Sequence, residues 1–267
     1  MTDQTISQRA HFLRALAHEA GQMALDAFHN RAAGHYELKG IQDPVTEADR
    51  AVEAHIRKQI AERFPDDGFL GEESGLFQRD SDCGVWVVDP IDGTDNFARG
   101  IPHFCVSIAW VQSGRVVLAA ISNPSTDELY LAELGQGATK NGLPISVSGT
   151  PDITMAAIEL GWSRRVDRAD YLAMLNGLLD RGANVRRCGS GALALAWVAE
   201  GRTDGYAELH MNSWDSLAGL LLVKEAGGVI SMPTAGAALL QKGGLVYAAN
   251  PSIASALIET VPVERAA

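Results

Sequence analysis

The sequence predicts a mixed α/β protein, because segments with helical periodicity and strand-like runs both occur along its 267 residues. From about Ser7 to Asn30, apolar residues recur every three or four positions, which indicates one buried face of a helix. Phe104–Gln112 is instead a strand-like run that Gly114 separates from the next run. A chain of this length could form one large domain or two small ones. Since no repeat, low-complexity segment or linker divides it, we expect one domain over 1–267, with halves of about 1–150 and 151–267 packed together.

The N-terminal part is expected to hold two helices joined by a loop. Thr5 and Gln8 have the spacing of a capping box at the start of the first helix. Arg31–Pro44 is polar and contains two glycines, which predicts a loop or a flexible hairpin. The second helix follows Thr46 and Asp49, whose spacing is typical of a helix N-terminal cap.

The remainder of the chain is expected to form strands, turns and helices. Three strand-like runs separated by turn residues suggest an antiparallel meander, namely Phe104–Gln112, Arg115–Ser122 and Glu128–Leu134. After a turn at Asn141-Gly142 we expect strands at Ile158–Leu160, Gly205–Leu209, Val229–Ser231 and Leu245–Ala248, and helices at Tyr171–Leu179, Asn212–Lys224 and from about Pro251.

Composition limits the classes of protein to which the chain can belong. A formal net charge of −11 without a basic run argues against a nucleic-acid-binding surface. Cys83, Cys105 and Cys188 are odd in number and form no C-x-x-C pair, which argues against a disulfide framework or a zinc site. No segment resembles a signal peptide or an uncharged membrane span. We therefore expect a cytoplasmic protein with no nucleic-acid or membrane partner.

The stretch Trp86–Phe97 places three carboxylates and a glycine turn directly after an apolar run. Val85–Val88 fits a strand that is buried on both faces. Pro90 cannot donate a ladder hydrogen bond, so the strand is expected to stop at Asp89.

Two carboxylates of this stretch, Asp89 and Asp92, are expected to lie across a tight turn and could face one point. Such anions repel one another unless a proton or a cation lies between them. Oxygen ligands with few histidines nearby favour Mg²⁺ or a similar cation over zinc. Gly93-Thr94 can open a helix whose free N–H groups are good phosphate donors. Carboxylate ligands for a metal ion, next to N–H groups that can bind phosphate, together predict phosphoryl chemistry.

Each acidic pattern also has an ordinary structural explanation. The Asp-Pro-x-Asp-Gly-Thr segment can be a turn with an Asx cap. Thr46 and Asp49 can serve only to cap a helix, and the adjacent Glu72 and Glu73 can be solvated surface. Asp215 falls in the first turn of a predicted helix, where the helix dipole stabilises a negative charge.

Taken together, three separated motifs resemble the inositol monophosphatase family of metal-dependent sugar phosphatases. They are Gly71-Glu72-Glu73-Ser74, Asp89-Pro90-Ile91-Asp92-Gly93-Thr94, and Trp214-Asp215 with Glu225-Ala226-Gly227-Gly228. Their order and spacing match the family over nearly the whole chain. The resemblance implies a layered α-β-α-β-α sandwich of the sugar-phosphatase type, a lithium-sensitive phosphatase activity and a homodimer.

The resemblance also implies roles for individual residues. Two or three Mg²⁺ ions would be held by Glu72, Asp89, the carbonyl of Ile91, Asp92 and Asp215. These ions would activate and orient a water and neutralise the leaving alkoxide. Asp49 and Thr94 would take the proton of that water, assisted by Glu72. Substrate contacts would come from Asp92, Gly93, Thr94, Ser190, Gly191, Glu208 and Asp215, with Glu208 on the sugar hydroxyls.

Three further features receive lesser roles. Lys39 and Asp43 lie in the segment that closes over the metal site in the family, and Glu73 is a weaker metal candidate than its neighbour. His103 is expected to pack or to form a surface hydrogen bond rather than to bind a ligand. Gly189–Ala194 matches a dinucleotide-binding pattern, but the polar segment before it is a poor parallel strand and no acidic residue follows at the expected distance.

The resulting functional prediction is release of phosphate from a small polyol or sugar phosphate, with inositol 1-phosphate preferred. The enzymatic alternatives are a histidinol-phosphate phosphatase and a nucleotide or fructose bisphosphate phosphatase. The alternative from another class is a regulatory or RNA-polymerase-binding protein.

Overall fold

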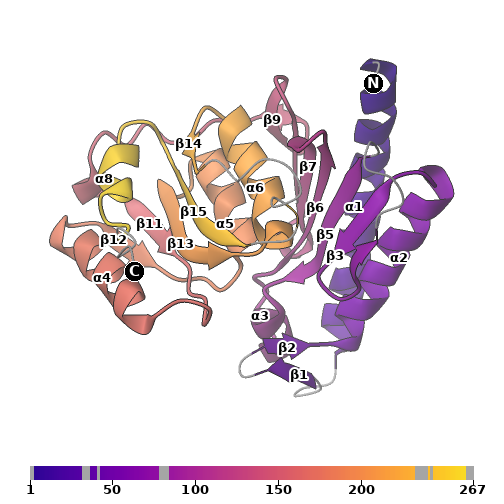
Figure 1. Cartoon of the computed structure of the whole chain (residues 1–267), viewed down its shortest axis with the longest axis horizontal. Coiled ribbons are helices and arrows are strands. Elements are labelled where there is room, and N and C mark those ends of the chain that lie inside the picture. Colours follow the sequence, from indigo (N-terminus) through magenta and orange to yellow (C-terminus); the bar gives the residue numbers. More distant parts are fainter. Residues whose placement is uncertain are drawn as a thin grey trace.

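The computed structural model describes residues 3–31, 37–40, 43–77, 84–231, 240 and 243–262. Within these residues the elements form five alternating layers of helix and sheet, which confirms the predicted sandwich (Figure 1). The first outer layer holds α1 (Asp3–Asn30) and α2 (Glu47–Arg63), the middle layer α5 (Gly191–Glu200) and α6 (Ser213–Glu225), and the second outer layer α4 (Arg168–Asp180) and α8 (Ala254–Ile258).

The larger sheet has eight described strands in the order β10-β9-β8-β7-β6-β5-β3-β4. They are β3 (Gly68–Gly71), β4 (Gly75–Phe77), β5 (Val85–Asp92), β6 (Cys105–Gln112), β7 (Arg115–Asn123), β8 (Glu128–Glu133), β9 (Gly137–Lys140) and β10 (Leu143–Pro144). From β5 to β10 each strand pairs antiparallel with the next, which confirms the predicted meander. The short α3 (Thr94–Arg99) follows β5 directly.

The smaller sheet has the order β12-β11-β13-β15-β14 among the described strands. They are β11 (Ala157–Leu160), β12 (Asn184–Arg186), β13 (Gly205–Met211), β14 (Val229–Ile230) and β15 (Gly244–Ala249). Strands β12, β11 and β13 run parallel, so their carboxyl ends meet at one edge of the sheet. The expectation that the segment before Gly189 is a poor parallel strand is wrong in part, because a short β12 does pair there at the sheet edge.

Strand β5 continues past Pro90, so the prediction that it stops at Asp89 is wrong. The pairing register of β5 with β6 shifts between Asp89 and Asp92. At this irregularity the ladder needs no hydrogen bond from Pro90, which has no N–H group to donate. The N–H of Ile91 donates instead to Oδ1 of Asp89 at 2.9 Å. All eight residues of the strand are buried, so both carboxylates are fixed on a rigid element.

The first helix begins earlier than predicted. It starts at Asp3, which places Thr5 inside the helix and makes the capping box predicted for Thr5 and Gln8 wrong. A helix extends readily through residues that contain no proline or glycine, because each added residue gains one hydrogen bond. The predicted hairpin is confirmed by the antiparallel pairing of β1 (Glu37–Gly40) with β2 (Asp43–Val45).

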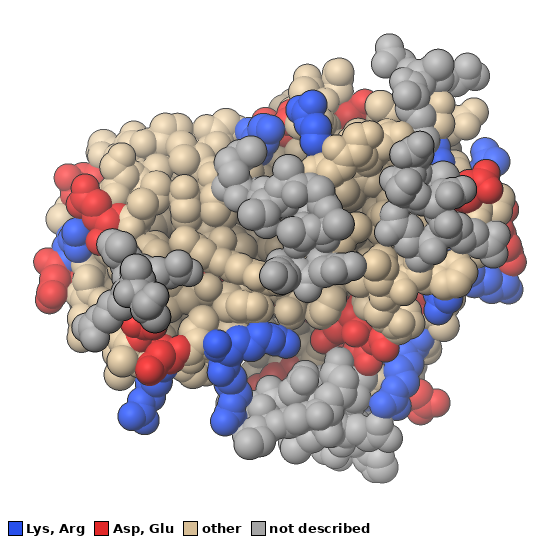
Figure 2. Space-filling view, in the orientation of Figure 1, with Lys and Arg blue, Asp and Glu red and all other residues tan. Residues whose placement is uncertain are grey.

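Three apolar clusters fill the spaces between the layers. One lies where α5 and α6 pack between the two sheets, a second beneath α1 and α2, and a third beneath α4 and α8. No described helix is both long enough and apolar enough to cross a membrane. On the face that Figure 2 shows, Lys and Arg are interspersed with Asp and Glu, and the described residues form no broad basic field there.

Candidate active site

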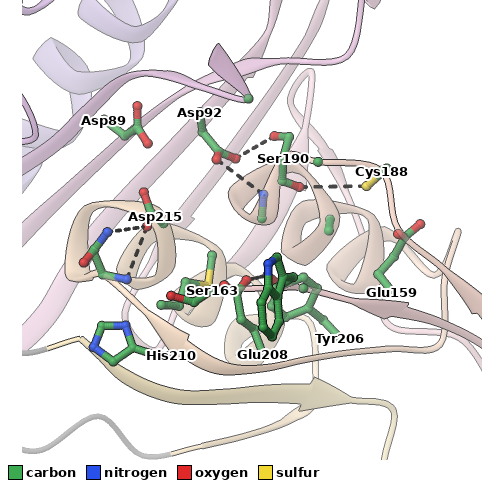
Figure 3. Close-up of a pocket in the computed structure, with 18 of the residues that line it drawn as sticks. Asp89, Asp92, Glu159, Ser163, Cys188, Ser190, Tyr206, Glu208, His210 and Asp215 are labelled. Atoms are coloured by element: carbon green, nitrogen blue, oxygen red, sulfur yellow. Dashed lines mark hydrogen bonds between the residues drawn. The ribbon is translucent and has the colours of Figure 1, made fainter. Parts of the chain in front are cut away.

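A cavity of about 790 Å³ opens where elements from both halves of the chain end. Its walls come from the end of β5 with the start of α3, the ends of β11 and β13, and the starts of α5 and α6. The predicted residues Glu72, Asp89, Asp92, Asp215 and Glu208 all line it. Figure 3 shows Asp89, Asp92 and Asp215 in one part of the cavity and Glu208 in another. The fold therefore gathers in one cavity residues that lie far apart in the sequence.

Asp89, Asp92 and Asp215 form the acidic centre of the cavity. Each offers a carboxylate oxygen, and these three atoms all lie within 4.8 Å of one another. Burial, followed by the negative charge of Glu72, raises the pKa of Asp89 and of Asp215 well above the usual range. A divalent cation would remove this electrostatic cost, and a set of hard oxygen donors suits Mg²⁺.

Asp92 is held by the first turn of α5. Its carboxylate accepts hydrogen bonds from the hydroxyl of Ser190 at 2.6 Å and from the N–H of Ala192 at 2.7 Å. The N–H of Gly191 donates to the same carboxylate at 3.3 Å. Burial raises the pKa of Asp92, and these bonds oppose the increase. The glycine-rich segment predicted to contact substrate thus holds a carboxylate of the acidic centre.

Asp215 lies both at a helix start and in the acidic centre. It lies in the first turn of α6, where its Oδ2 accepts hydrogen bonds from the N–H of Asn212 at 3.2 Å and from the side-chain amide of Asn212 at 3.1 Å. This is the reciprocal half of a capping box. The helix cap therefore fixes the carboxylate in the acidic centre.

Asp49 likewise combines a helix cap with a contact in the site. One oxygen, Oδ2, accepts the N–H of Thr46 at 2.8 Å and completes a capping box at the start of α2. The other oxygen, Oδ1, accepts the hydroxyl of Thr94 at 3.2 Å. The carbonyl of Ile91, at 2.9 Å, is an alternative acceptor for the single proton of the same hydroxyl. Burial raises the pKa of Asp49, and the hydrogen bonds from Thr46 oppose the increase.

Glu72 lies in the turn between β3 and β4, which is held by a residue that the sequence analysis missed. The buried carboxylate of Glu53 in α2 accepts the N–H of Glu73 and the N–H of Ser74, each at 2.9 Å. A Cβ at Gly71 would lie 2.4 Å from this carboxylate, so only glycine leaves room for it. A glutamate within a helix looks like solvated surface in sequence, and no pattern pointed to Glu53.

Glu208 lies on β13 beside Tyr206, whose hydroxyl donates to it at 2.5 Å. Burial raises the pKa of Glu208 to about 7, and the bond from Tyr206 opposes that increase. Gly161 permits the close approach of β11, because a Cβ there would lie 2.0 Å from Oε2 of Glu208. Glu208 is therefore a hydrogen-bonding side chain whose pKa is raised by burial and lowered in part by the hydroxyl of Tyr206.

Sequence reasoning also missed a group of cavity residues at or beyond the carboxyl ends of the strands. These residues are Trp162, Arg164, Arg165, Arg187 and His210. A signal for some of them was available, since two adjacent arginines follow the predicted strand Ile158–Leu160. A polar loop after a strand is a place where ligands commonly bind.

The remaining predicted residues have simpler surroundings. Glu73 does not line this cavity, and His103 packs edge-on against Trp197 with ring centres 4.9 Å apart, as expected for a packing residue. The side chains of Lys39 and Asp43, and all of Cys83, lie outside the described part of the chain.

Comparison with known proteins gives consistent matches along the chain. The sequence pattern described as "Inositol monophosphatase family" matches residues 6–265. "Inositol-1-monophosphatase" of Rhizobium meliloti is 42% identical over 226 residues, which are 84% of this chain and 85% of that protein. "Nus factor SuhB" of Pseudomonas aeruginosa is 37% identical over 255 residues, 93% of each chain. The crystal structure of extragenic suppressor protein suhB from Bartonella henselae superposes with a TM-score of 0.85 at 35% identity and covers 95% of this chain and 97% of that one.

Proposed function

The chain belongs to the inositol monophosphatase family and is a phosphatase, and from this premise we propose a Mg²⁺-dependent hydrolase that releases phosphate from a small polyol phosphate. The proposed substrate is inositol 1-phosphate, which the name of the relative from Rhizobium meliloti supports. The observation that carries the metal dependence is the convergence of Asp89, Asp92 and Asp215 within 4.8 Å.

The proposed ligands of two or three Mg²⁺ ions are Glu72, Asp89, the carbonyl of Ile91, Asp92 and Asp215. The raised pKa of Asp89 and of Asp215 supports this assignment, because buried carboxylates that repel one another gain stability from a cation. When bound, such ions lower the pKa of a water and offset the negative charge of the phosphate and of the leaving oxygen.

The residues of the chain itself supply the proton path. Oγ of Thr94 can accept the proton of the attacking water while its own proton passes to Oδ1 of Asp49, which lies 3.2 Å away. Glu72, whose negative charge acts on Asp89 and Asp215, assists in this proposal by holding the water. The N–H groups of Gly93 and Thr94, together with Ser190 and Gly191, are the proposed contacts near the phosphate.

We assign to Glu208 the contact with the part of the substrate that carries the sugar hydroxyls. Its carboxylate accepts the hydroxyl of Tyr206 and has further oxygen lone pairs with which to accept sugar hydroxyls. We extend the proposal to a single domain that forms a homodimer and acts in the cytoplasm, in line with the family resemblance.

Phosphate release from a panel of phosphomonoesters tests the proposal. The panel holds inositol 1-phosphate, histidinol phosphate, fructose 1,6-bisphosphate and adenosine 3′,5′-bisphosphate, each with and without Mg²⁺ and Li⁺. Preferred release from inositol 1-phosphate that needs Mg²⁺ and is inhibited by Li⁺ supports it. Preference for another compound overturns the choice of substrate, and absence of release from all four overturns the proposed hydrolase.

A second candidate function is a regulatory role through binding to another protein. The name "Nus factor SuhB" of the relative from Pseudomonas aeruginosa favours it. A partner retained from native lysate by both the wild type and Asp215→Asn would support this role. Loss of that partner in the variant would tie the interaction to the metal site.

A further inference from the structure

Tyr206 extends from the buried core to the wall of the cavity. Its side chain is only 2% exposed and belongs to the apolar cluster around α5 and α6, yet the residue also lines the cavity. Glu208 follows two positions later on β13, and side chains two positions apart on a strand point to the same face of the sheet. The strand therefore places the phenol and the carboxylate side by side (Figure 3).

Two glycines leave room for the hydroxyl of Tyr206. A Cβ at Gly161, which follows β11, would lie 2.5 Å from this oxygen, and a Cβ at Gly191, the first residue of α5, would lie 2.9 Å from it. Gly191 also donates its N–H to Asp92 of the acidic centre. The hydroxyl is therefore enclosed by backbone from two elements, one of which holds the acidic centre, and it has little freedom to move.

The enclosed hydroxyl acts as a hydrogen-bond donor to Glu208. The phenolic oxygen lies 2.5 Å from Oε2 of the carboxylate. Burial, followed by the negative charge of Glu208, raises the pKa of Tyr206 well above its usual value, so the phenol keeps its proton. An ionised carboxylate can only accept, and the bond then runs from Tyr206 to Glu208.

The other carboxylate oxygen of Glu208, Oε1, has no hydrogen-bond partner among the described residues, and Glu208 lines the cavity. A carboxylate oxygen with open lone pairs accepts hydrogen bonds from hydroxyl groups. Because the phenol holds Oε2, the direction of Oε1 is set before a substrate arrives. Such pre-organisation reduces the conformational freedom that is lost on binding.

We propose that Tyr206 is a positioning residue that fixes Glu208 so that Oε1 accepts a ring hydroxyl of the polyol phosphate. Tyr206 acts through Glu208 and does not itself contact the substrate. This inference rests on the proposed function and deepens it, because it assigns recognition of the polyol to a pair of residues. The pair then contributes to substrate binding, whereas hydrolysis depends on the acidic centre.

A double-mutant cycle tests the inference. KM and kcat for inositol 1-phosphate with Mg²⁺ are measured in the wild type, Tyr206→Phe, Glu208→Ala and the double variant. Phenylalanine keeps the ring in the core and removes only the hydroxyl. The inhibition constant of inorganic phosphate, measured in the same proteins, reports on the acidic end alone. The control is Tyr247→Phe, which removes a hydroxyl from the neighbouring strand β15, outside the cavity.

Tyr206→Phe is expected to raise KM about fivefold, which corresponds to the loss of about 1 kcal/mol for one hydrogen bond. Both kcat and the inhibition constant of phosphate should stay within about twofold of the wild type. In the Glu208→Ala background the same substitution should leave KM unchanged, because a residue that acts through Glu208 has no effect without it. The control should behave as the wild type.

Four results would each overturn the inference and leave the proposed function standing. They are an unchanged KM in Tyr206→Phe, a fall in kcat alone, an equal rise in KM in both backgrounds, and a parallel rise in the inhibition constant of phosphate. An equal rise in both backgrounds would mean that Tyr206 acts independently of Glu208. If the wild type releases no phosphate from inositol 1-phosphate, both this inference and the proposed substrate are overturned.

Discussion

The two ends of the cavity are built in different ways. At the acidic end, Asp89 and Asp92 are only 2% and 9% exposed, and each is fixed by a strand or by backbone amides. At the other end, Arg165 and Arg187 are exposed on loops, and their guanidinium groups have no described hydrogen-bond partner. The difference fits the proposed function, in which the reaction needs rigidly positioned groups, whereas exposed loop side chains can change without disturbing the core.

The largest effect is expected from the acidic end, with Asp215→Asn. Removing this ligand charge should lower kcat/KM by about 10³-fold or more, because bound metal ions stabilise the transition state by several kcal/mol. Without metal, the variant should melt at or above the wild-type temperature, since one of several buried, repelling charges is gone. Enzyme assays measure the change in kcat/KM, and thermal melts with and without Mg²⁺ measure the change in melting temperature.

The neighbouring exposed residue Asp95 supplies the control, because it forms an ion pair with Arg99 outside the acidic centre. Asp95→Asn should retain both the activity and the Mg²⁺-induced rise in melting temperature. Activity of Asp215→Asn within severalfold of the wild type would contradict the assignment of Asp215 as a ligand.

The next effect concerns the support beneath the acidic end. Glu53→Gln leaves a single oxygen for the two N–H groups of Glu73 and Ser74, so the turn that carries Glu72 should loosen. Loss of such a supporting contact commonly costs about 10–100-fold in metal affinity or activity. The Mg²⁺ concentration for half-maximal rate should therefore rise, while Glu62→Gln on the exposed face of α2 should leave it unchanged.

A smaller effect is expected at the substrate end from Gly161→Ala. The added methyl group would meet Oε2 of Glu208 at 2.0 Å and the hydroxyl of Tyr206 at 2.5 Å, so Glu208 must move. Loss of one hydrogen bond to a hydroxyl corresponds to about 1 kcal/mol, or a KM about fivefold higher. Gly149→Ala has no atom within 4 Å of the new Cβ and should behave as the wild type. An unchanged KM in Gly161→Ala would argue against a substrate contact at Glu208.

The smallest effect is a pH dependence of stability at the substrate end. Burial raises the pKa of Glu208 to about 7 in the folded protein, so wild-type stability should fall as pH rises from the unfolded value toward and through 7. Glu208→Gln cannot ionise and should lack this loss, which we expect to be about 1–3 kcal/mol. Urea unfolding of the metal-free proteins at about pH 5 and about pH 8 checks this. Parallel pH curves would show that Glu208 does not have the raised pKa.

Several residues that line the cavity were already predicted from the sequence as site residues. The motif around Asp89 and Asp92 follows a buried apolar strand, and carboxylates at a strand end can be recognised without a structure. Asp215 and Glu208 could be placed beside them only through the family resemblance, since nothing local links positions so far apart. The structure brings all four to one cavity.

Other features could not be predicted, because they depend on partners distant in sequence. Pro90 looked like the end of a strand, yet the irregular pairing with β6 lets β5 continue to Asp92. Ser190 and Gly191 were predicted as substrate contacts, yet both donate hydrogen bonds to Asp92. Glu53 looked like a surface residue, yet it supports the turn of Glu72.

The sequence by itself determined the mixed α/β class and the acidic motifs with their metal-binding chemistry, because apolar periodicity and the donor chemistry of carboxylates are local properties, whereas the layered sandwich was implied by the family resemblance. Tertiary structure decided which groups are paired and which are left available. Pairing depends on the packing of distant elements, and this packing gives Glu53 and Ser190 to the acidic end while the guanidinium groups of Arg165 and Arg187 find no partner among the described residues.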